Sequence, residues 1–135
     1  MAVANLVNPA QEIVTGNDNI VIVDILQTIR GGRTLDVTNF TPDVIKAGHV
    51  IIMETATKEY KPMPVKDNGS GVMIYDALPS GHAYAGIEIN TILKARPMAG
   101  ILVRGTVNPK AAPYPMDSIL AAVKAALPLI DFRED

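Results

Sequence analysis

The chain has 135 residues, enough for one domain with a sizeable core, and its 48% hydrophobic content excludes a disordered chain. The net charge is −2 and there is no basic cluster, so the sequence lacks the grouped Lys and Arg residues that bind nucleic-acid phosphates. Cysteine is absent, which excludes disulfides, thiolate metal sites and cysteine nucleophiles. Charged residues make up only 19% of the chain, and we therefore expect part of the surface to be buried by self-association.

The sequence shows no targeting or membrane segment. The first residues lack the positively charged segment and the sustained apolar run of a signal peptide. No apolar run approaches the roughly 20 residues that span a bilayer. We therefore expect a soluble protein, made in the cytoplasm, that binds neither membranes nor nucleic acids.

Residues 1–18 mix Asn, Gly, Ala and Gln with isolated aliphatic residues. Turn signals at Asn8-Pro9 and at 16–19 predict a flexible arm that becomes ordered when it contacts a partner. A frayed terminus without a role is the alternative explanation of the same pattern.

The region 19–40 opens with the most apolar segment of the chain, in which both faces of a strand would be apolar. This pattern predicts a strand that is buried on both sides. An apolar strand left at an open sheet edge promotes aggregation, so the core or a partner subunit must cover it. We therefore predict a contact with a partner subunit that involves Ile20, Val21, Ile22, Val23 and Ile25.

The middle of the chain alternates short apolar runs with turn signals. A Thr-Pro pair opens the segment 41–44, which predicts one helical turn there. We expect a strand at 49–54, and a second arm at 59–65 that lies at a sheet edge because its two prolines cannot donate ladder hydrogen bonds. A Gly-rich loop at 67–71 and a short strand at 72–75 are predicted next.

Two aliphatic arms at 84–93 and 98–107 are separated by a short polar segment that ends in Pro97. This is the pattern of a β-hairpin with a longer loop. In the second arm alternate residues fall on opposite faces, with Ala99, Ile101 and Val103 on one face and Gly100, Leu102 and Arg104 on the other. Three glycines stand where a small barrel would bend or where two backbones would approach closely: Gly86, Gly100 and Gly105.

Near the C-terminus the sequence predicts one α-helix. Asp117 is a favourable N-cap, apolar residues recur at helical spacing through an Ala-rich segment, and Pro128 stops the helix. Residues 129–132 are expected to add a short strand. The predicted fold is therefore mainly β, a small β-barrel or β-tulip-like single domain over residues 19–135, with one short C-terminal α-helix.

Asp24 is the most unusual carboxylate, because it interrupts the most apolar segment of the chain. A buried carboxylate must be neutralised or hydrogen-bonded. Arg30, Arg33 or Arg104 could supply that partner across strands or across subunits.

The two histidines, His49 and His82, each follow a glycine at the start of an expected strand. His82 and Tyr84 would share one strand face, a geometry suited to acid–base catalysis or metal binding. The sequence contains no HxH or HExxH spacing, so we expect partly exposed histidines and assign no catalytic, metal-binding or cofactor-binding residue. The alternative is a small β-barrel enzyme or ligand-binding protein that uses His82, Tyr84 and an acidic partner, Asp24 or Asp36.

Four short phrases occur in an order that goes beyond a generic β domain. They are AGHVI at 47–51, EYKP at 59–62, AGI at 85–87 and GILVRGTV at 100–107, and the Ala-rich helix follows them. In this order the chain resembles bacteriophage head decoration proteins of the lambda D type and the related head-fibre proteins of tailed phages. The resemblance covers residues 47–127.

The resemblance implies a small β-tulip or barrel-like domain that forms a homotrimer on the outside of a phage capsid, where it binds and cements the major capsid protein. It also implies an N-terminal arm, here residues 1–18, that adds a strand to a capsid sheet. The apolar strand at 20–26 has no clear equivalent in decoration proteins, so region 19–40 is expected to be an added oligomerisation element, as in the base of a head fibre. The expected location is the capsid surface of the virion, after synthesis in the host cytoplasm. A third interpretation is a binding module of a non-viral bacterial complex.

Overall fold

The computed structural model describes residues 18–134, so the predicted arm at 1–18 lies outside the described residues except for Asp18. The chain is mainly β, with 39% strand and 12% helix, and it has one helix of seven residues near the C-terminus. These features confirm the predicted fold class. The described sheets do not close on themselves, so the predicted barrel is not confirmed.

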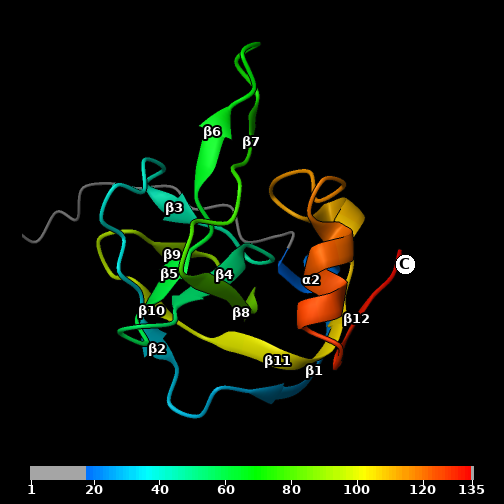
Figure 1. Cartoon of the computed structure of the whole chain (residues 1–135). Helices are drawn as coiled ribbons and strands as arrows, with labels where there is room; N and C mark the ends of the chain where they lie inside the picture. The colour runs from blue at the N-terminus through cyan, green and yellow to red at the C-terminus, as the bar shows by residue number, and fades with distance from the viewer. Residues whose placement is uncertain (1–17, 135) are drawn as a thin grey trace, which may run out of the picture.

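The elements follow one another in short segments along the chain (Figure 1). In order they are α1 Asp18–Val21, β1 Ile22–Thr28, β2 Arg33–Thr34, β3 Val44–Ile45, β4 Val50–Glu54, β5 Tyr60–Pro62, β6 Val65–Asp67, β7 Met73–Tyr75, β8 His82–Glu88, β9 Ile92–Leu93, β10 Met98–Ala99, β11 Ile101–Val107, the 3-10 helix η1 Pro109–Ala111, α2 Leu120–Ala126 and β12 Ile130–Phe132.

A six-stranded sheet organises the molecule, with the strand order β1-β11-β8-β4-β5 and β12 also paired with β11. All its pairs are antiparallel except β11 with β12. Three two-stranded sheets pair β10 with β2, β3 with β9, and β6 with β7. The β6–β7 hairpin projects away from the rest of the molecule, at the top of Figure 1.

The predicted hairpin at 84–107 forms only in its central part. β8 and β11 pair through Glu88 with Ile101 and Ile87 with Leu102, as expected for the two arms. The residues between them leave this pair, and β9 pairs with β3 while β10 pairs with β2. The hairpin therefore opens into two separate strand pairs instead of closing in one loop.

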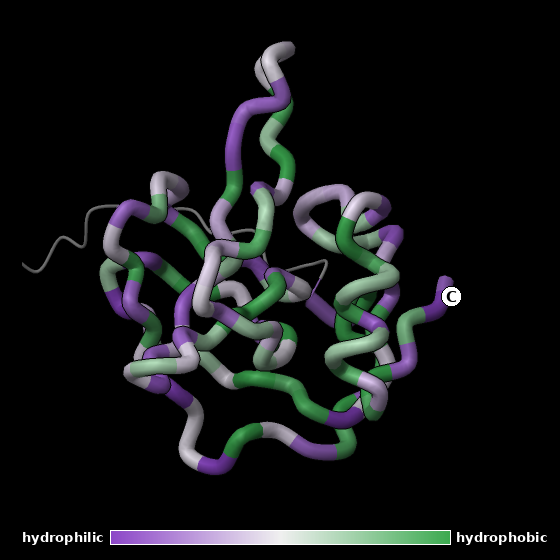
Figure 2. The backbone as a smooth tube through the Cα atoms, in the orientation of Figure 1, coloured by the Kyte–Doolittle hydropathy of each residue, from purple (hydrophilic) through white to green (hydrophobic). Residues whose placement is uncertain are grey.

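The core lies on both faces of the large sheet, because neighbouring residues of its central strands enter different apolar clusters. Ile52 and Leu102 belong to a cluster that also contains Val123 of α2, whereas Ile51 and Ile101 belong to a second cluster. This alternation is the period-two arrangement of a strand covered on both faces, and it confirms the predicted separation of Ile101 from Leu102. Figure 2 shows the hydrophobic stretch along β11.

Two of the glycines allow the close approach that the sequence predicts. A Cβ atom at Gly86 would lie 2.6 Å from the Leu102 carbonyl oxygen on β11. Gly105 has φ 154°, and a Cβ atom there would collide with the Asp24 carbonyl oxygen on β1. Glycine at these two positions therefore lets β8 and β1 pack against β11 at short range.

The predicted strand at 20–23, buried on both sides, is wrong. Val21 ends the short helix α1, β1 begins at Ile22, and β1 is an edge strand whose only partner among the described strands is β11. The register shifts between Ile22 and Asp24, so Val23 is an extra residue that bulges away from the ladder. Asp24 is exposed rather than buried, and none of the ion pairs between residues 18–134 joins its carboxylate to Arg30, Arg33 or Arg104.

Two helix predictions also need correction. The segment 41–44 forms no helical turn, because the β-branched residues Val44 and Ile45 form β3 and pair with β9 in a two-stranded sheet. The C-terminal helix begins at Leu120 with Ile119 as its N-cap, not at Asp117, and no side chain caps it. Its first turn is instead anchored by Met116, which is buried and whose carbonyl oxygen accepts hydrogen bonds from both Ile119 and Leu120.

Several local predictions are confirmed. The proline-containing arm forms β5 at the opposite end of the sheet from β1, where missing N–H groups remove no central ladder bond. The predicted loop at 67–71 joins β6 to β7, and the strand expected at 72–75 is β7. The last predicted strand is β12, which pairs in parallel with β11.

Candidate functional site

Four large apolar side chains are exposed together at the beginning of the described chain. They are Ile20 of α1 and Val23, Ile25 and Leu26 of β1, each between 40% and 65% exposed, and we call them the apolar edge. Single exposed apolar residues are ordinary on a protein surface, but four of them within seven consecutive residues concentrate exposed apolar area on one segment at the edge of the sheet. The apolar edge is therefore the first candidate for a functional surface.

The bulges of β1 help to explain why two of these side chains are exposed. Val23 and Leu26 are both extra residues relative to β11, because the register shifts between Ile22 and Asp24 and again between Ile25 and Gln27. A bulged residue has no partner in the neighbouring strand, so nothing on β11 covers its side chain. The outer side of β1 pairs with no other described strand.

The predicted contact residues divide into two groups in the structure. Ile20, Val23 and Ile25 belong to the apolar edge, so their contact with a partner remains a prediction. Val21 and Ile22 are buried in the chain's own core at 2% and 7% exposure, and they are unavailable to a partner in this conformation. Leu26 is the most exposed member of the apolar edge. It was not among the predicted contact residues, although it continues the same apolar run in the sequence.

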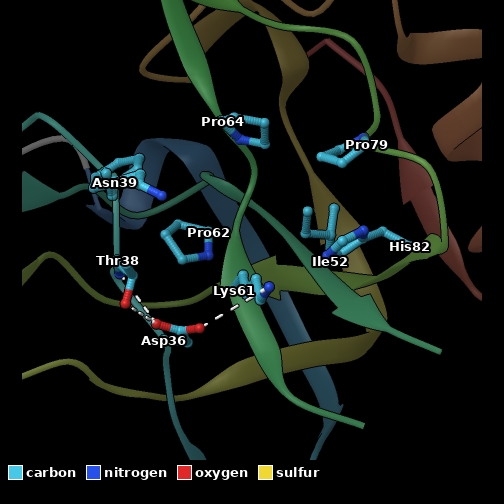
Figure 3. A pocket seen from close by; sticks show the side chains of 10 residues that line it. Asp36, Thr38, Asn39, Ile52, Lys61, Pro62, Pro64, Pro79 and His82 are labelled. Atoms are coloured by element: carbon cyan, nitrogen blue, oxygen red, sulfur yellow. Dashed lines mark hydrogen bonds and ion pairs between the residues drawn. The ribbon is translucent and has the colours of Figure 1, made fainter. Parts of the chain in front are cut away.

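The second candidate is a pocket of about 250 Å³ beside β5, which we call the proline pocket. Figure 3 shows the rings of Pro62, Pro64 and Pro79 around it, with the His82 ring beside Ile52. The complete lining is Asp36, Thr38, Asn39, Phe40, Ile52, Lys61, Pro62, Pro64, Pro79 and His82. The pocket thus brings together His82 and Asp36, two residues of the alternative function, but not Tyr84, whose ring packs against the core.

The charges at the proline pocket are already paired with one another. Lys61 Nζ lies 3.9 Å from the Asp36 carboxylate and 3.4 Å from the Glu54 carboxylate. Asp36 also accepts hydrogen bonds from the Thr38 hydroxyl at 2.6 Å and the Thr38 N–H at 3.1 Å. The hydroxyl bond is the main reason why the pKa of Asp36 is lowered, and the pKa of Glu54 is lowered chiefly by its hydrogen bond from Thr57.

The protonation of the His82 ring can be read from its surroundings. Its Nδ1 atom lies 3.0 Å from the Ser80 carbonyl oxygen, and because a carbonyl oxygen only accepts, Nδ1 carries the hydrogen. In the neutral ring Nε2 is then an acceptor. His82 is partly buried, as the sequence predicts for a histidine at the start of a strand.

His49 contradicts the prediction of a partly exposed histidine, because none of its surface is accessible. Its Nε2 atom donates to the Met63 carbonyl oxygen at 2.9 Å, and the rings of Phe40, Tyr75 and Tyr114 surround it edge-on at 5.3 to 5.5 Å. Burial lowers the pKa of His49 to about 4, so the ring is neutral at neutral pH. Its Nδ1 atom has no hydrogen-bond partner within residues 18–134.

Glu88 is the buried carboxyl that sequence reasoning missed. It ends β8 with no accessible surface; Oε1 accepts from the Asn90 N–H at 3.2 Å, and Oε2 has no partner among the described atoms. Burial raises the pKa of Glu88 to about 8, with a smaller contribution from the Asp18 charge. Its position between Ile87 and Ile89, in a strand buried on both faces, was the available signal.

No protein-family model, curated protein or solved structure matches the chain. Over the described residues, no helix has the length and apolar character needed to cross a membrane. The same residues contain no group of three His, Cys, Asp or Glu side chains placed to hold a metal ion. The candidate sites are therefore the apolar edge and the proline pocket, and both are suited to binding.

Proposed function

We propose that the chain is a structural virion protein that forms a homo-oligomer, a trimer, and binds the major capsid protein on the outside of a phage capsid. In this role it cements the capsid or forms the base of a head fibre, and it performs no catalysis. The observation that carries the proposal is the apolar edge, a group of large apolar side chains that the chain itself leaves uncovered.

The four phrases of the resemblance support the proposal through their position in the fold. AGHVI leads into β4, EYKP contains β5, AGI lies in β8 and GILVRGTV contains β11. These four strands are consecutive neighbours in the large sheet. A small β-tulip or barrel-like domain built around them is part of the proposal.

The apolar area at the apolar edge supports self-association. Complete burial of a Val, Leu or Ile side chain stabilises by about 1.5–3 kcal/mol, so four half-exposed side chains contribute roughly 3–6 kcal/mol per chain. A contact that buries the apolar edge of two copies therefore contributes roughly 6–12 kcal/mol, against a cost of about 4–15 kcal/mol in lost freedom of motion. The trimer itself is what the resemblance to decoration proteins implies, and a capsid lattice would supply further contacts.

Light scattering after size exclusion, at several protein concentrations, tests the oligomer. We expect a trimer for the wild-type chain and a monomer for the double variant Ile25→Asp, Leu26→Asp, because both side chains are exposed and the changes leave the core intact. Val72→Asp is the matched control, since Val72 is 51% exposed and lies at the loop end of the β6–β7 hairpin. A double variant that stays trimeric would refute the role of the apolar edge.

Binding to undecorated capsids tests the partner. We expect the wild-type chain and Val72→Asp to bind and the double variant to bind weakly. An oligomer with no affinity for capsids would support the third interpretation, a binding module of a non-viral complex. The N-terminal arm at 1–18 would be tested in the same assay by deleting it.

The second candidate function is a ligand-binding protein or small enzyme, and the observation that favours it is the proline pocket with its His82 and Asp36. His82→Ala and Asp36→Ala separate the two candidates. In an enzyme or ligand-binding protein these variants lose activity or binding. In a capsid protein they leave oligomerisation and capsid attachment unchanged.

A further inference from the structure

Five of the ten residues that line the proline pocket are apolar. Three of these are Pro62, Pro64 and Pro79, and Phe40 and Ile52 complete the apolar part of the lining. A proline ring fixes its own backbone angle and loses no side-chain freedom on binding. The pocket is therefore formed before a ligand arrives, which lowers the entropic cost of binding.

Hydrogen bonds hold these walls in place. The Pro64 carbonyl oxygen accepts from Asp76 N–H at 2.8 Å, and the Met63 N–H donates to the Val50 carbonyl oxygen at 2.8 Å. The Pro79 carbonyl oxygen accepts from the His82 N–H at 3.3 Å. Both sides of the pocket are thus tied to the strands that carry them.

The size of the pocket selects one ring. An apolar cavity of about 150 Å³ in another protein binds benzene, and this pocket holds about 250 Å³. The space fits one benzene ring with a substituent, but it is too small for a nucleotide or an oligosaccharide.

The polar groups disfavour an anion and leave one hydrogen-bond acceptor for a neutral ligand. Lys61 is already paired with Asp36 and Glu54, so it offers little attraction to an anion, while the Asp36 carboxylate repels one. His82 Nε2 is the acceptor left by the bond from Nδ1 to Ser80, and a hydroxyl on the ring would donate to it.

We propose that the proline pocket binds a phenol ring, with the ring between Pro62, Pro64 and Pro79 and the hydroxyl donating to His82 Nε2. The inference rests on the second candidate function and is independent of the capsid proposal. The phenol belongs either to a free small molecule or to a tyrosine side chain, and the same chemistry recognises both.

The test is a titration of the ¹⁵N-labelled full chain with phenol, followed by NMR chemical shifts. We expect saturable shifts at Asp36–Phe40, Lys61 and His82 with a Kd of roughly 1 mM, as for a fragment of this size. Benzoate and cyclohexanol should bind at least about tenfold more weakly, because one is an anion and the other is not a flat ring. N-acetyltyrosinamide separates the two sources: binding equal to that of phenol indicates a tyrosine ligand, and no binding indicates a free phenol.

His82→Phe tests the hydroxyl contact. This variant keeps an aromatic ring and removes the acceptor, so phenol should bind about tenfold more weakly while benzene binding is unchanged. Tyr60→Phe, on the neighbouring part of the sheet but outside the pocket lining, is the control and should bind phenol as the wild type does. The phenol assignment is overturned if the ratio of phenol to benzene affinity is the same in His82→Phe and wild type. If benzoate or cyclohexanol shifts the signals of the pocket residues and phenol does not, the pocket binds a ligand but the ligand is not a phenol. If none of the probes shifts these signals, the second candidate function is refuted as well.

Discussion

Glu88 gives the chain a stability that falls as the pH rises above neutrality. Its carboxyl is fully buried, and burial raises its pKa to about 8, from 4.5 for an ordinary glutamate. The folded chain therefore holds this proton more tightly than the unfolded chain does. The stabilisation is complete below about pH 4.5 and is lost as the pH rises through about 8.

The pKa of His49 is shifted in the opposite direction, and this shift limits the pH range in which Glu88 alone changes the stability. Its pKa falls from 6.5 to about 4 on burial, so its contribution is complete above pH 6.5 and is lost as the pH falls through about 4. Between about pH 4.5 and 6.5 His49 makes the free energy of unfolding rise with pH and Glu88 makes it fall, and the two slopes cancel. Above pH 6.5 only the Glu88 slope remains, about 1.4 kcal/mol per pH unit. Between pH 6.5 and 8 the free energy of unfolding should fall by about 2 kcal/mol.

Urea unfolding of the wild type and of Glu88→Gln at pH 6.5 and pH 8 measures this effect. Glutamine has the same shape and does not titrate, so the variant should lack the loss of about 2 kcal/mol. Glu59→Gln is the matched control, because Glu59 is exposed, and it should lose stability with pH as the wild type does. Equal losses in the wild type and in Glu88→Gln would refute the reasoning, because the titrating group would then be another residue.

Three further changes test the packing. Gly86→Ala should lower the free energy of unfolding by about 1–3 kcal/mol in urea, because its Cβ meets the Leu102 carbonyl oxygen, and an unchanged midpoint would contradict that contact. Met63→Ala should cost about 2–5 kcal/mol in the same assay, because Met63 is fully buried, and a cost below 1 kcal/mol would show that the cavity collapses. His49→Phe removes the slope that opposes Glu88, so its free energy of unfolding in urea should rise as the pH falls from 6.5 to 4.5, whereas that of the wild type should change little, and equal changes in both proteins would contradict the assignment to His49.

Local signals in the sequence were enough to place most of the strands. The prolines of the arm at 59–65, of which Pro62 lies in β5, favour an edge position because they lack N–H groups, and the glycine-rich loop before β7 favours a turn. The alternation along β11 predicts which of its residues share a face. Each of these features depends on residues close together in the chain, so the sequence pattern carries them directly.

The remaining features depend on pairing between distant segments. An apolar run such as 20–26 is compatible with a central strand or with an edge strand, and only its register with β11 decides that Ile22 is buried and Leu26 exposed. The burial of His49 likewise depends on Tyr75 and Tyr114, which lie far along the chain. Of the residues that line the proline pocket, His82 and Asp36 were named as candidates for the alternative function, Pro62 and Pro64 were assigned only to a sheet edge, and Pro79 was given no role.

The pairing of β1 with β11 has a consequence for synthesis on the ribosome. Residues 29–100 separate the two strands, and translation adds about 5–20 residues per second, so β1 waits roughly 4–15 s for its partner. During that interval the backbone of β1 and the apolar edge are both open to solvent, and a nascent chain in this state is a substrate for chaperones. A ribosome stalled before residue 101 would therefore hold a chain that cannot complete its sheet, and a molecule released at that point would be prone to aggregate.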